Sequence, residues 1–178
     1  MTIDSTILPG AYLITPDIRG DERGEFFRVF CKRELSVIGH SAEFVQFNHS
    51  VNRVKGLVRG MHFQKAPHSE IKLVRCVRGA VYDVIVDMRI DSPTYLKWIG
   101  VELSASNRSI IYIPEGFAHG FQTLEENSEL LYHHTAYYEP AFEQGVNHLD
   151  PTIHIDWPLA VTMVSERDKN LPFIHINP

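Results

Sequence analysis

Short strand-like segments follow one another through most of this chain. The runs rich in β-branched and aromatic residues are FVQFNHSV, RGMHFQ, IKLVRCVR, AVYDVIVDMR, KWIGVELS, SIIYIP, FQTL and ELLYHHTAYY, which together span residues 44–138. Turn-forming residues such as Gly79, Ser92–Pro93 and Asn107 separate them. Many short strands with turns between them, roughly every 8 to 12 residues, are typical of a β-sandwich or barrel. The sequence therefore predicts an all-β fold.

The two ends of the chain carry weaker patterns. Near the N-terminus, Ala11–Ile14 predicts a strand, and a charged loop follows it as far as Gly24. The segment KRELSVIG predicts one short helix that ends at Gly39, since glycine commonly stops helices. From Asp150 onward the chain alternates poorly and is rich in proline, so we expect an irregular tail packed over the barrel. At 178 residues, the length fits a single domain spanning residues 1–178 with one or two short helices.

Composition limits which partners the protein can bind and in which cellular compartment it is expected. The net charge is −5, from 17 basic and 22 acidic residues, which argues against binding nucleic acid through a general positive field. No apolar run approaches the roughly 20 residues of a membrane helix, and the N-terminus does not resemble a secretion signal. Cys31 and Cys76 lack metal-site spacing, so we expect reduced thiols. A cytoplasmic protein that binds neither membranes nor nucleic acid is predicted.

Chemically reactive side chains concentrate in two stretches. Residues 56–78 hold Arg59, His62, Glu70 and Lys72 between two predicted strands. The second stretch, IIYIPEGFAHGF, places His119 between glycines and behind a proline, which predicts a tight, exposed corner at the end of a strand. We expect the two stretches to meet.

Alternation along the strands predicts which side chains share a face, because residues two apart point the same way. Lys72 shares its face with Val74 and Cys76, and Tyr132 shares its face with His134. If Lys72 and Tyr132 face inward, each is a polar group among apolar neighbours and needs a partner or a function.

A set of motifs in a fixed order carries a resemblance. From Arg23 to Asp168 these motifs are RGEF, QFNHS, RGMHFQ, KLVR, DVIVDMRIDSPTY, IPEGFAHGF, LY, YYEP, DP, IDWP and SERD. The chain resembles the dTDP-4-dehydrorhamnose 3,5-epimerase family of nucleotide-sugar epimerases from about Gly20 to Pro172. The resemblance implies a cupin-type jelly roll (a double-stranded β-helix) that forms a homodimer. It also implies proton removal and return beside the 4-keto group of a nucleotide-linked deoxysugar, with no metal or organic cofactor.

The implied chemistry requires a base, a group that stabilises the enolate, and an acid on the opposite face of the sugar ring. By resemblance, His62 is the base and Asp168 orients it. Lys72 polarises the keto oxygen and holds the enolate charge. Tyr132 returns the proton from the other face, which inverts the carbon centre.

Substrate binding is implied in the same way. By the same resemblance, Arg59 binds the diphosphate and Tyr138 stacks on the nucleobase. His119 contacts the substrate or a neighbouring side chain. Further substrate contacts are implied at Arg23, Gln46, Asn48, Glu143 and Arg167. The chain departs from the family pattern at Arg28, where glutamate is usual, at Glu70, where glutamine is usual, and at His133–His134, where Lys-Thr is usual.

Alternatives remain open on the sequence alone. A metal-dependent cupin could use His62, His119 and Glu70, although Gln64 stands where a further histidine ligand belongs. That reading leaves Tyr132, Lys72 and Asp168 without roles. A nucleotide-sugar-binding cupin without activity, an epimerase acting at one centre only, and an enzyme for CDP- or GDP-linked sugars also fit.

Overall fold

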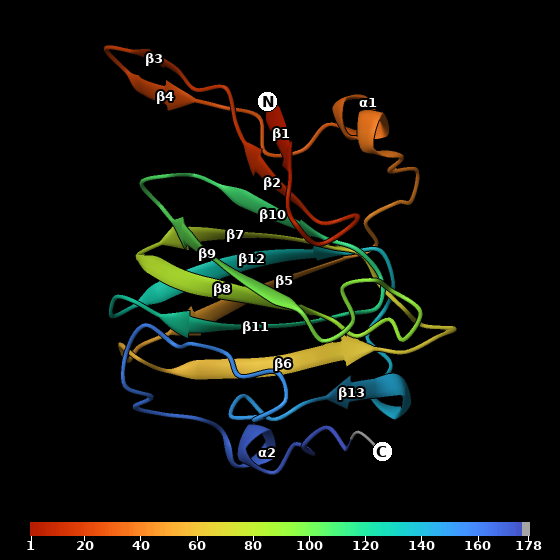
Figure 1. Cartoon of the computed structure of the whole chain (residues 1–178). Helices are drawn as coiled ribbons and strands as arrows, with labels where there is room; N and C mark the ends of the chain where they lie inside the picture. The colour runs from red at the N-terminus through yellow and green to blue at the C-terminus, as the bar shows by residue number, and fades with distance from the viewer. Residues whose placement is uncertain (176–178) are drawn as a thin grey trace.

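Two β-sheets face each other and form the body of the protein (Figure 1). The computed structural model describes residues 1–175. The six-stranded sheet has the order β1 (Thr2–Ser5), β2 (Tyr12–Thr15), β10 (Ile110–Ile113), β7 (Lys72–Arg78), β12 (Ser128–His134) and β5 (Gln46–Asn52). The five-stranded sheet has the order β13 (Glu143–Gly145), β6 (Val58–Gln64), β11 (Phe117–Thr123), β8 (Ala80–Asp87) and β9 (Trp98–Ser104). Neighbouring strands are antiparallel throughout, so the predicted jelly roll is confirmed.

The main core lies between the sheets. Val74 and Cys76 of β7 and Leu130 of β12 pack there against Ile85 of β8 and Phe121 of β11, all buried. Burial of side chains of this size stabilises the fold by roughly 1.5–3 kcal/mol each. The face of β7 that carries Lys72, Val74 and Cys76 points inward, as the alternation predicted.

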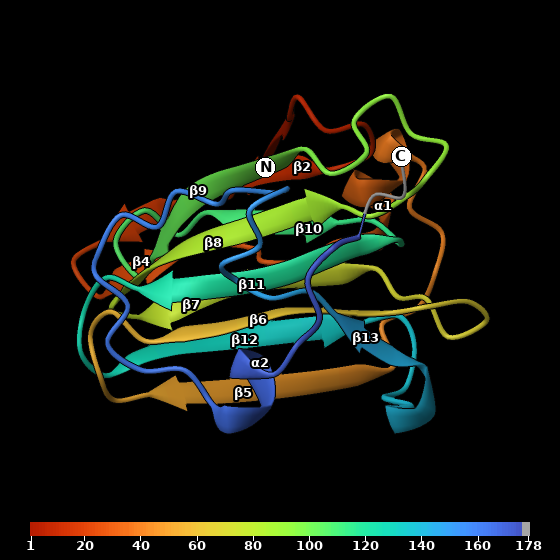
Figure 2. The same cartoon turned by 60° about the horizontal axis from the view of Figure 1, so that its bottom comes forward.

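A second apolar cluster lies on the outer face of the five-stranded sheet, where the C-terminal tail covers it (Figure 2). Val84 and Val86 of β8 contact Ile153 and Ile155 from the tail. The tail is irregular apart from α2 (Glu166–Lys169), so the prediction of an irregular tail packed over the barrel is confirmed. The Ser165 hydroxyl caps α2 by accepting a hydrogen bond from the backbone N–H of Asp168.

The N-terminal region holds more structure than the sequence indicated. The predicted helix is present as α1 (Lys32–Leu35) and the 3-10 turn η1 (Ser36–Ile38), and Gly39 ends it with a φ of 80°. The segment expected to be a loop instead forms a hairpin of β3 (Arg19–Asp21) and β4 (Gly24–Phe26), which projects from the body (Figure 1). Strand β1 was not predicted either. A further 3-10 turn, η2 (Pro140–Phe142), precedes β13. Within residues 1–175, no helix has the length and apolar character needed to cross a membrane.

Strand β11 corrects the expectation for His119. The prediction that His119 lies at an exposed corner is wrong, because β11 begins at Phe117 and includes His119. His119 is only 6% exposed. The strand pairs on both sides, so His119 lies opposite Ile85 of β8 and His62 of β6. The next residue must be glycine, because a Cβ at Gly120 would lie 2.6 Å from the carbonyl oxygen of Arg59. The two reactive stretches therefore meet as neighbouring strands.

Candidate active site

A pocket of about 350 Å³ opens between the two sheets. Both reactive stretches of the sequence contribute to its walls, and the C-terminal tail adds α2. The lining residues are Gln46, Asn48, Ser50, Arg59, His62, Phe63, Gln64, Glu70, Lys72, His119, Gly120, Phe121, Tyr132, His134, Tyr138, Glu143, Ser165, Arg167 and Asp168.

His62 and Asp168 form a hydrogen-bonded pair on the wall made by β6. His62 Nε2 lies 2.8 Å from Asp168 Oδ1, and Asp168 Oδ2 accepts the N–H of Gly60 at 3.1 Å. Burial raises the pKa of Asp168, but the hydrogen bonds from His62 and Gly60 outweigh burial, and the net pKa is lowered. An ionised Asp168 holds the proton on Nε2 of His62. Nδ1 is then the ring nitrogen that can accept a proton.

An irregularity in β6 places Arg59 beside His62. His62 pairs with His119 on β11, whereas Arg59 pairs with Phe121, so three residue steps on β6 match two on β11. Simple alternation would put residues three apart on opposite faces of a strand. The extra residue turns Arg59 into the pocket, where its Nε donates to Asn52 Oδ1 at 2.7 Å.

Lys72 approaches the pocket from β7, in the other sheet. Its Nζ lies 3.1 Å from Glu70 Oε1 and donates to the carbonyl oxygen of His62 at 3.4 Å. Glu70 Oε2 accepts a hydrogen bond from Nδ1 of His134 at 2.7 Å. Burial raises the pKa of Glu70, but the hydrogen bond from His134 and the Lys72 ammonium outweigh burial, and the net pKa is lowered. Glu70 therefore stays ionised. The ammonium group is therefore fixed beside His62.

Tyr132 lies on β12, across the pocket from β6. Its hydroxyl is 3.2 Å from Ser50 Oγ, and its ring stacks on His134 and meets the His119 ring edge-on. Burial raises the pKa of Tyr132. The phenol is thus kept protonated on the wall that faces His62.

His119 is paired within the wall. Its Nε2 lies 2.9 Å from Oδ2 of Asp83, a fully buried carboxylate. This hydrogen bond fixes the ring of His119 at the base of the pocket, next to Tyr132.

Polar residues form the rim of the pocket. Gln46 Oε1 accepts the backbone N–H of Tyr138 at 3.0 Å, and the Tyr138 hydroxyl donates to Glu143 Oε2 at 2.6 Å. Glu143 also forms an ion pair with Arg167. The rim therefore combines an exposed aromatic ring, on which a nucleobase could stack, with an arginine that could bind a phosphate group.

Comparison with known proteins gives the family. The model described as dTDP-4-dehydrorhamnose 3,5-epimerase matches residues 5–175. The chain belongs to this family. A dTDP-4-dehydrorhamnose 3,5-epimerase from Shigella flexneri is 43% identical, with 96% of this chain and 94% of the relative covered. A dTDP-4-dehydrorhamnose 3-epimerase from Streptomyces niveus is 42% identical over 92% of this chain and 79% of its own. The structure of a Legionella pneumophila 3,5-epimerase in complex with dTDP-4-keto-L-rhamnose superposes with a TM-score of 0.92 at 39% identity, covering 97% of this chain and 92% of that one.

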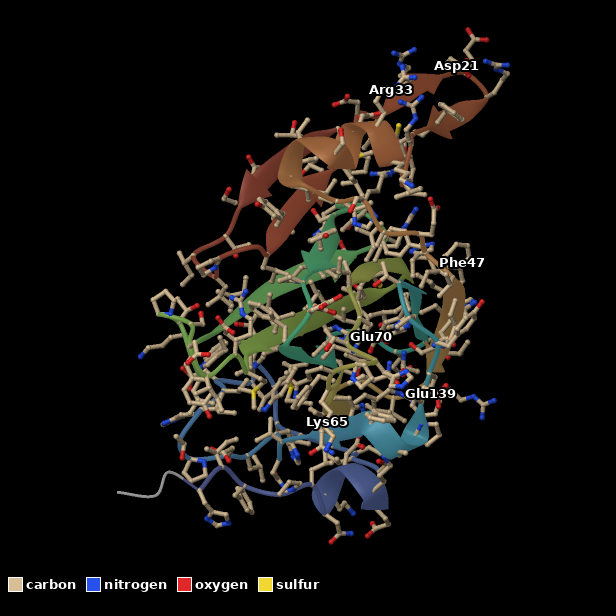
Figure 3. All side chains as sticks on the ribbon, turned by 90° about the vertical axis from the view of Figure 1, so that its right-hand side faces the viewer. Asp21, Arg33, Phe47, Lys65, Glu70 and Glu139 are labelled. Atoms are coloured by element: carbon tan, nitrogen blue, oxygen red, sulfur yellow. The ribbon has the colours of Figure 1, made fainter. Side chains whose placement is uncertain are left out.

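The pocket collects nearly all the residues that the family resemblance indicated. His62, Lys72, Tyr132 and Asp168 line it, and so do Gln46, Asn48, Arg59, His119, Tyr138, Glu143 and Arg167. Arg23 does not. It lies in the β3–β4 hairpin, where it is paired with Asp21 (labelled in Figure 3), and its side chain is 89% exposed. Arg28 also lies outside the pocket and pairs with Glu34.

Several lining residues were not predicted as part of the site. Ser50 could have been found by alternation, since it lies two residues beyond Asn48 on the same strand. Glu70 was considered as a metal ligand and as a departure from the family pattern, and His134 as a departure that shares the face of Tyr132, but neither was predicted to contact the other. Their contact joins residues 64 positions apart, which a sequence pattern does not reveal.

The residues of the metal-site alternative pair separately. His62 bonds to Asp168, His119 bonds to Asp83, and Glu70 bonds to Lys72 and His134. Among residues 1–175, no group of three or more His, Cys, Asp or Glu side chains is arranged to hold a metal ion.

Proposed function

We propose that the protein epimerises dTDP-4-dehydro-6-deoxy-D-glucose at C3 and C5 to give dTDP-4-dehydro-L-rhamnose. One observation carries the proposal: a histidine–carboxylate pair and a protonated tyrosine stand on opposite walls of one pocket. Inversion requires a proton to leave one face of the sugar and return to the other. A base and an acid that face each other across the ring supply both steps.

In the proposed mechanism, Nδ1 of His62 removes the proton from the carbon beside the keto group. The C–H electron pair becomes the enolate, whose oxygen is stabilised by the Lys72 ammonium. Asp168 stabilises the imidazolium that forms, because it is a carboxylate 2.8 Å from Nε2. Tyr132 then gives its hydroxyl proton to the opposite face of the carbon. The Tyr132 tyrosinate then takes a proton from water, and the His62 imidazolium gives its proton to water, which restores the enzyme.

In this proposal, the rim and the adjoining pocket wall supply the nucleotide contacts. Tyr138 stacks on the base, Arg59 and Arg167 bind the diphosphate, and Gln46 and Asn48 donate hydrogen bonds. Because Arg167 and Glu143 already form an ion pair, the arginine is held in place before the ligand arrives. Preorganised charged groups bind phosphate with less loss of side-chain entropy.

The number of inverted centres is decided by experiment. The 3-epimerase relative is nearly as similar to this chain as the 3,5-epimerase relatives, so overall identity does not separate the two outcomes. The test is incubation of the dTDP-linked substrate in heavy water, with deuterium at C3 and C5 counted by NMR. CDP- and GDP-linked 4-keto sugars run in parallel. Deuterium at both positions is expected with the dTDP sugar. Deuterium at C3 alone would reduce the reaction to one centre, and none at either would favour a binding protein without activity.

We also propose a homodimer. The exposed face of β5 carries Phe47 at 67% and Val51 at 53% exposure, and Phe26 in the projecting hairpin is 73% exposed. Figure 3 shows Phe47 on the surface strand and Asp21 at the far end of the hairpin. A second copy of the chain that covers this apolar surface would account for its exposure in the single chain. In such a dimer, Arg23 is expected to reach toward the partner's pocket. Light scattering at micromolar concentration is expected to give twice the chain mass, and a monomer would refute the pairing.

The compartment proposed is the cytoplasm. Cys31 and Cys76 are both free thiols, which suits a reducing environment.

A further inference from the structure

A buried carboxylate lies directly behind Lys72. Glu70 Oε1 is 3.1 Å from Lys72 Nζ, and Glu70 Oε2 is 2.7 Å from His134 Nδ1. The side chains of Glu70, Lys72 and His134 are 10%, 9% and 10% exposed. A carboxylate with both oxygens engaged this far from solvent fixes its two partners in space.

The hydrogen bonds continue from His134 to the rim. His134 Nε2 is 3.3 Å from Asn48 Nδ2, and Asn48 Oδ1 accepts from Gln46 Nε2 at 3.3 Å. The amide nitrogen of Asn48 can only donate, so Nε2 of His134 is the acceptor and Nδ1 carries the proton given to Glu70. Each contact in this series can therefore run from a donor to an acceptor. A single ordered series therefore joins the rim residues Gln46 and Asn48 to Lys72.

We propose that Glu70 and His134 act as a pair of positioning residues, which aim the Lys72 ammonium at the substrate oxygen and couple its position to Asn48 at the rim. The inference rests on the proposed function, in which Lys72 holds the enolate charge. Its new content is that two residues outside the reacting set act through Lys72. The pair is a feature of this chain, since both positions depart from the family pattern.

Changing either member alone should disturb the series. In Glu70→Gln, the side-chain oxygen can accept from Lys72, but the amide nitrogen then faces His134 Nδ1. The ring must move its proton to Nε2, where it meets the donor nitrogen of Asn48. In His134→Thr, the shorter side chain leaves Glu70 Oε2 without its partner, so the carboxylate holds Lys72 more tightly and away from substrate.

Changing both members should restore order. Glu70→Gln with His134→Thr removes the misdirected donor and the uncompensated charge together, and gives the residue types usual in the family at these positions. Each single variant should lower kcat about tenfold with little change in KM, because Lys72 acts mainly on the transition state. The double variant should return to within about threefold of wild type, which is the coupling expected of two contacting residues.

A matched control lies in the C-terminal tail, outside both the pocket lining and the surface proposed for the dimer. His154 Nε2 and Asp156 Oδ1 are 3.8 Å apart, and their side chains are 81% and 84% exposed. Asp156→Asn and His154→Asn remove a carboxylate charge and a histidine ring there, and should leave kcat and KM at wild-type values.

The experiment combines this mutant cycle with 15N NMR of the histidine rings in the wild-type protein at mildly alkaline pH. The proton of His134 is expected on Nδ1 in wild type and on Nε2 in Glu70→Gln. Single variants with wild-type kcat, or a double variant as slow as the product of the two single losses, would overturn the proposal. So would a wild-type His134 that carries its proton on Nε2, a result that needs no variant to fold. An inactive wild type that shows the expected tautomers would refute the epimerase function and leave the hydrogen-bond series standing.

Discussion

Replacing Asp168 by asparagine should impair His62 as the base without preventing substrate binding. Asp168 is 4% exposed and accepts hydrogen bonds from His62 at 2.8 Å and Gly60 at 3.1 Å. Asparagine has one acceptor oxygen. If that oxygen stays on the Gly60 N–H, the amide nitrogen faces His62 Nε2 and requires Nε2 to be unprotonated. The histidine proton then moves to Nδ1, the nitrogen that should remove the proton from the substrate.

The size of the effect follows from those contacts. A wrong tautomer and the loss of a negative charge beside the imidazolium should lower kcat by about a hundredfold to ten-thousandfold. Loss of one charge-assisted hydrogen bond should lower the free energy of unfolding by about 2 kcal/mol, and the melting temperature by roughly 4–8 °C for a chain of this size. Substrate affinity should change little, because Asp168 reaches the substrate only through His62.

The assay is turnover of the dTDP-linked 4-keto sugar by NMR, alongside thermal unfolding. The matched control is Asp156→Asn, which changes an exposed carboxylate in the same tail, with a side chain 84% exposed. That variant should match wild type in both measurements. Wild-type turnover by a folded Asp168→Asn protein would refute the role of the pair.

Three further outcomes follow from the structure. Hydrogen bonds from Arg89, Ser92 and Thr94 outweigh burial and lower the pKa of Asp87 to about 2. Asp87 should therefore contribute about 2 kcal/mol of unfolding free energy above about pH 4, lost as the pH falls toward 2, and Asp87→Asn should remove that acid-sensitive part in urea titrations across this range. Exhaustive chelation should leave turnover unchanged, with elemental analysis below one equivalent of transition metal per chain; loss of turnover together with a stoichiometric metal would overturn the mechanism. Phe47→Glu should shift light scattering toward the monomer mass, because a charge would enter an apolar contact; an unchanged mass would place the interface elsewhere.

Regular strands made part of the site predictable. Strands β7 and β12 are each paired on both sides, and their mutual register is regular from Leu130 to His134, beyond a shift at Glu129. The inward directions of Lys72 and Tyr132 follow from alternation along this regular stretch. The chemical argument that an inward polar group needs a partner also applies, since Lys72 meets Glu70 and Tyr132 meets Ser50.

Irregular backbone hid the rest. Arg59 and His62 share a wall only because β6 gains a residue relative to β11, and Gly60, a glycine inside the strand, indicates an irregularity without fixing its register. Asp168 lies 106 positions from His62, in a four-residue helix of an otherwise irregular tail. Local periodicity says nothing about such a contact, so only the family motif pointed to it. The buried position of His119 was missed because the glycines beside it suggested a turn, whereas Gly120 serves a close approach of two backbones.

Solvent exchange by His62→Ala and Tyr132→Phe in heavy water tests the two-wall mechanism most directly. With the dTDP-linked 4-keto sugar, His62→Ala should give no deuterium at C3 or C5, because no enolate forms. Tyr132→Phe should still exchange with retention, because His62 can return a solvent-derived proton to the face it came from, while inversion collapses by about a hundredfold or more. Wild-type exchange in His62→Ala, or equal loss of exchange and inversion in Tyr132→Phe, would contradict the assignment of base and acid to opposite walls.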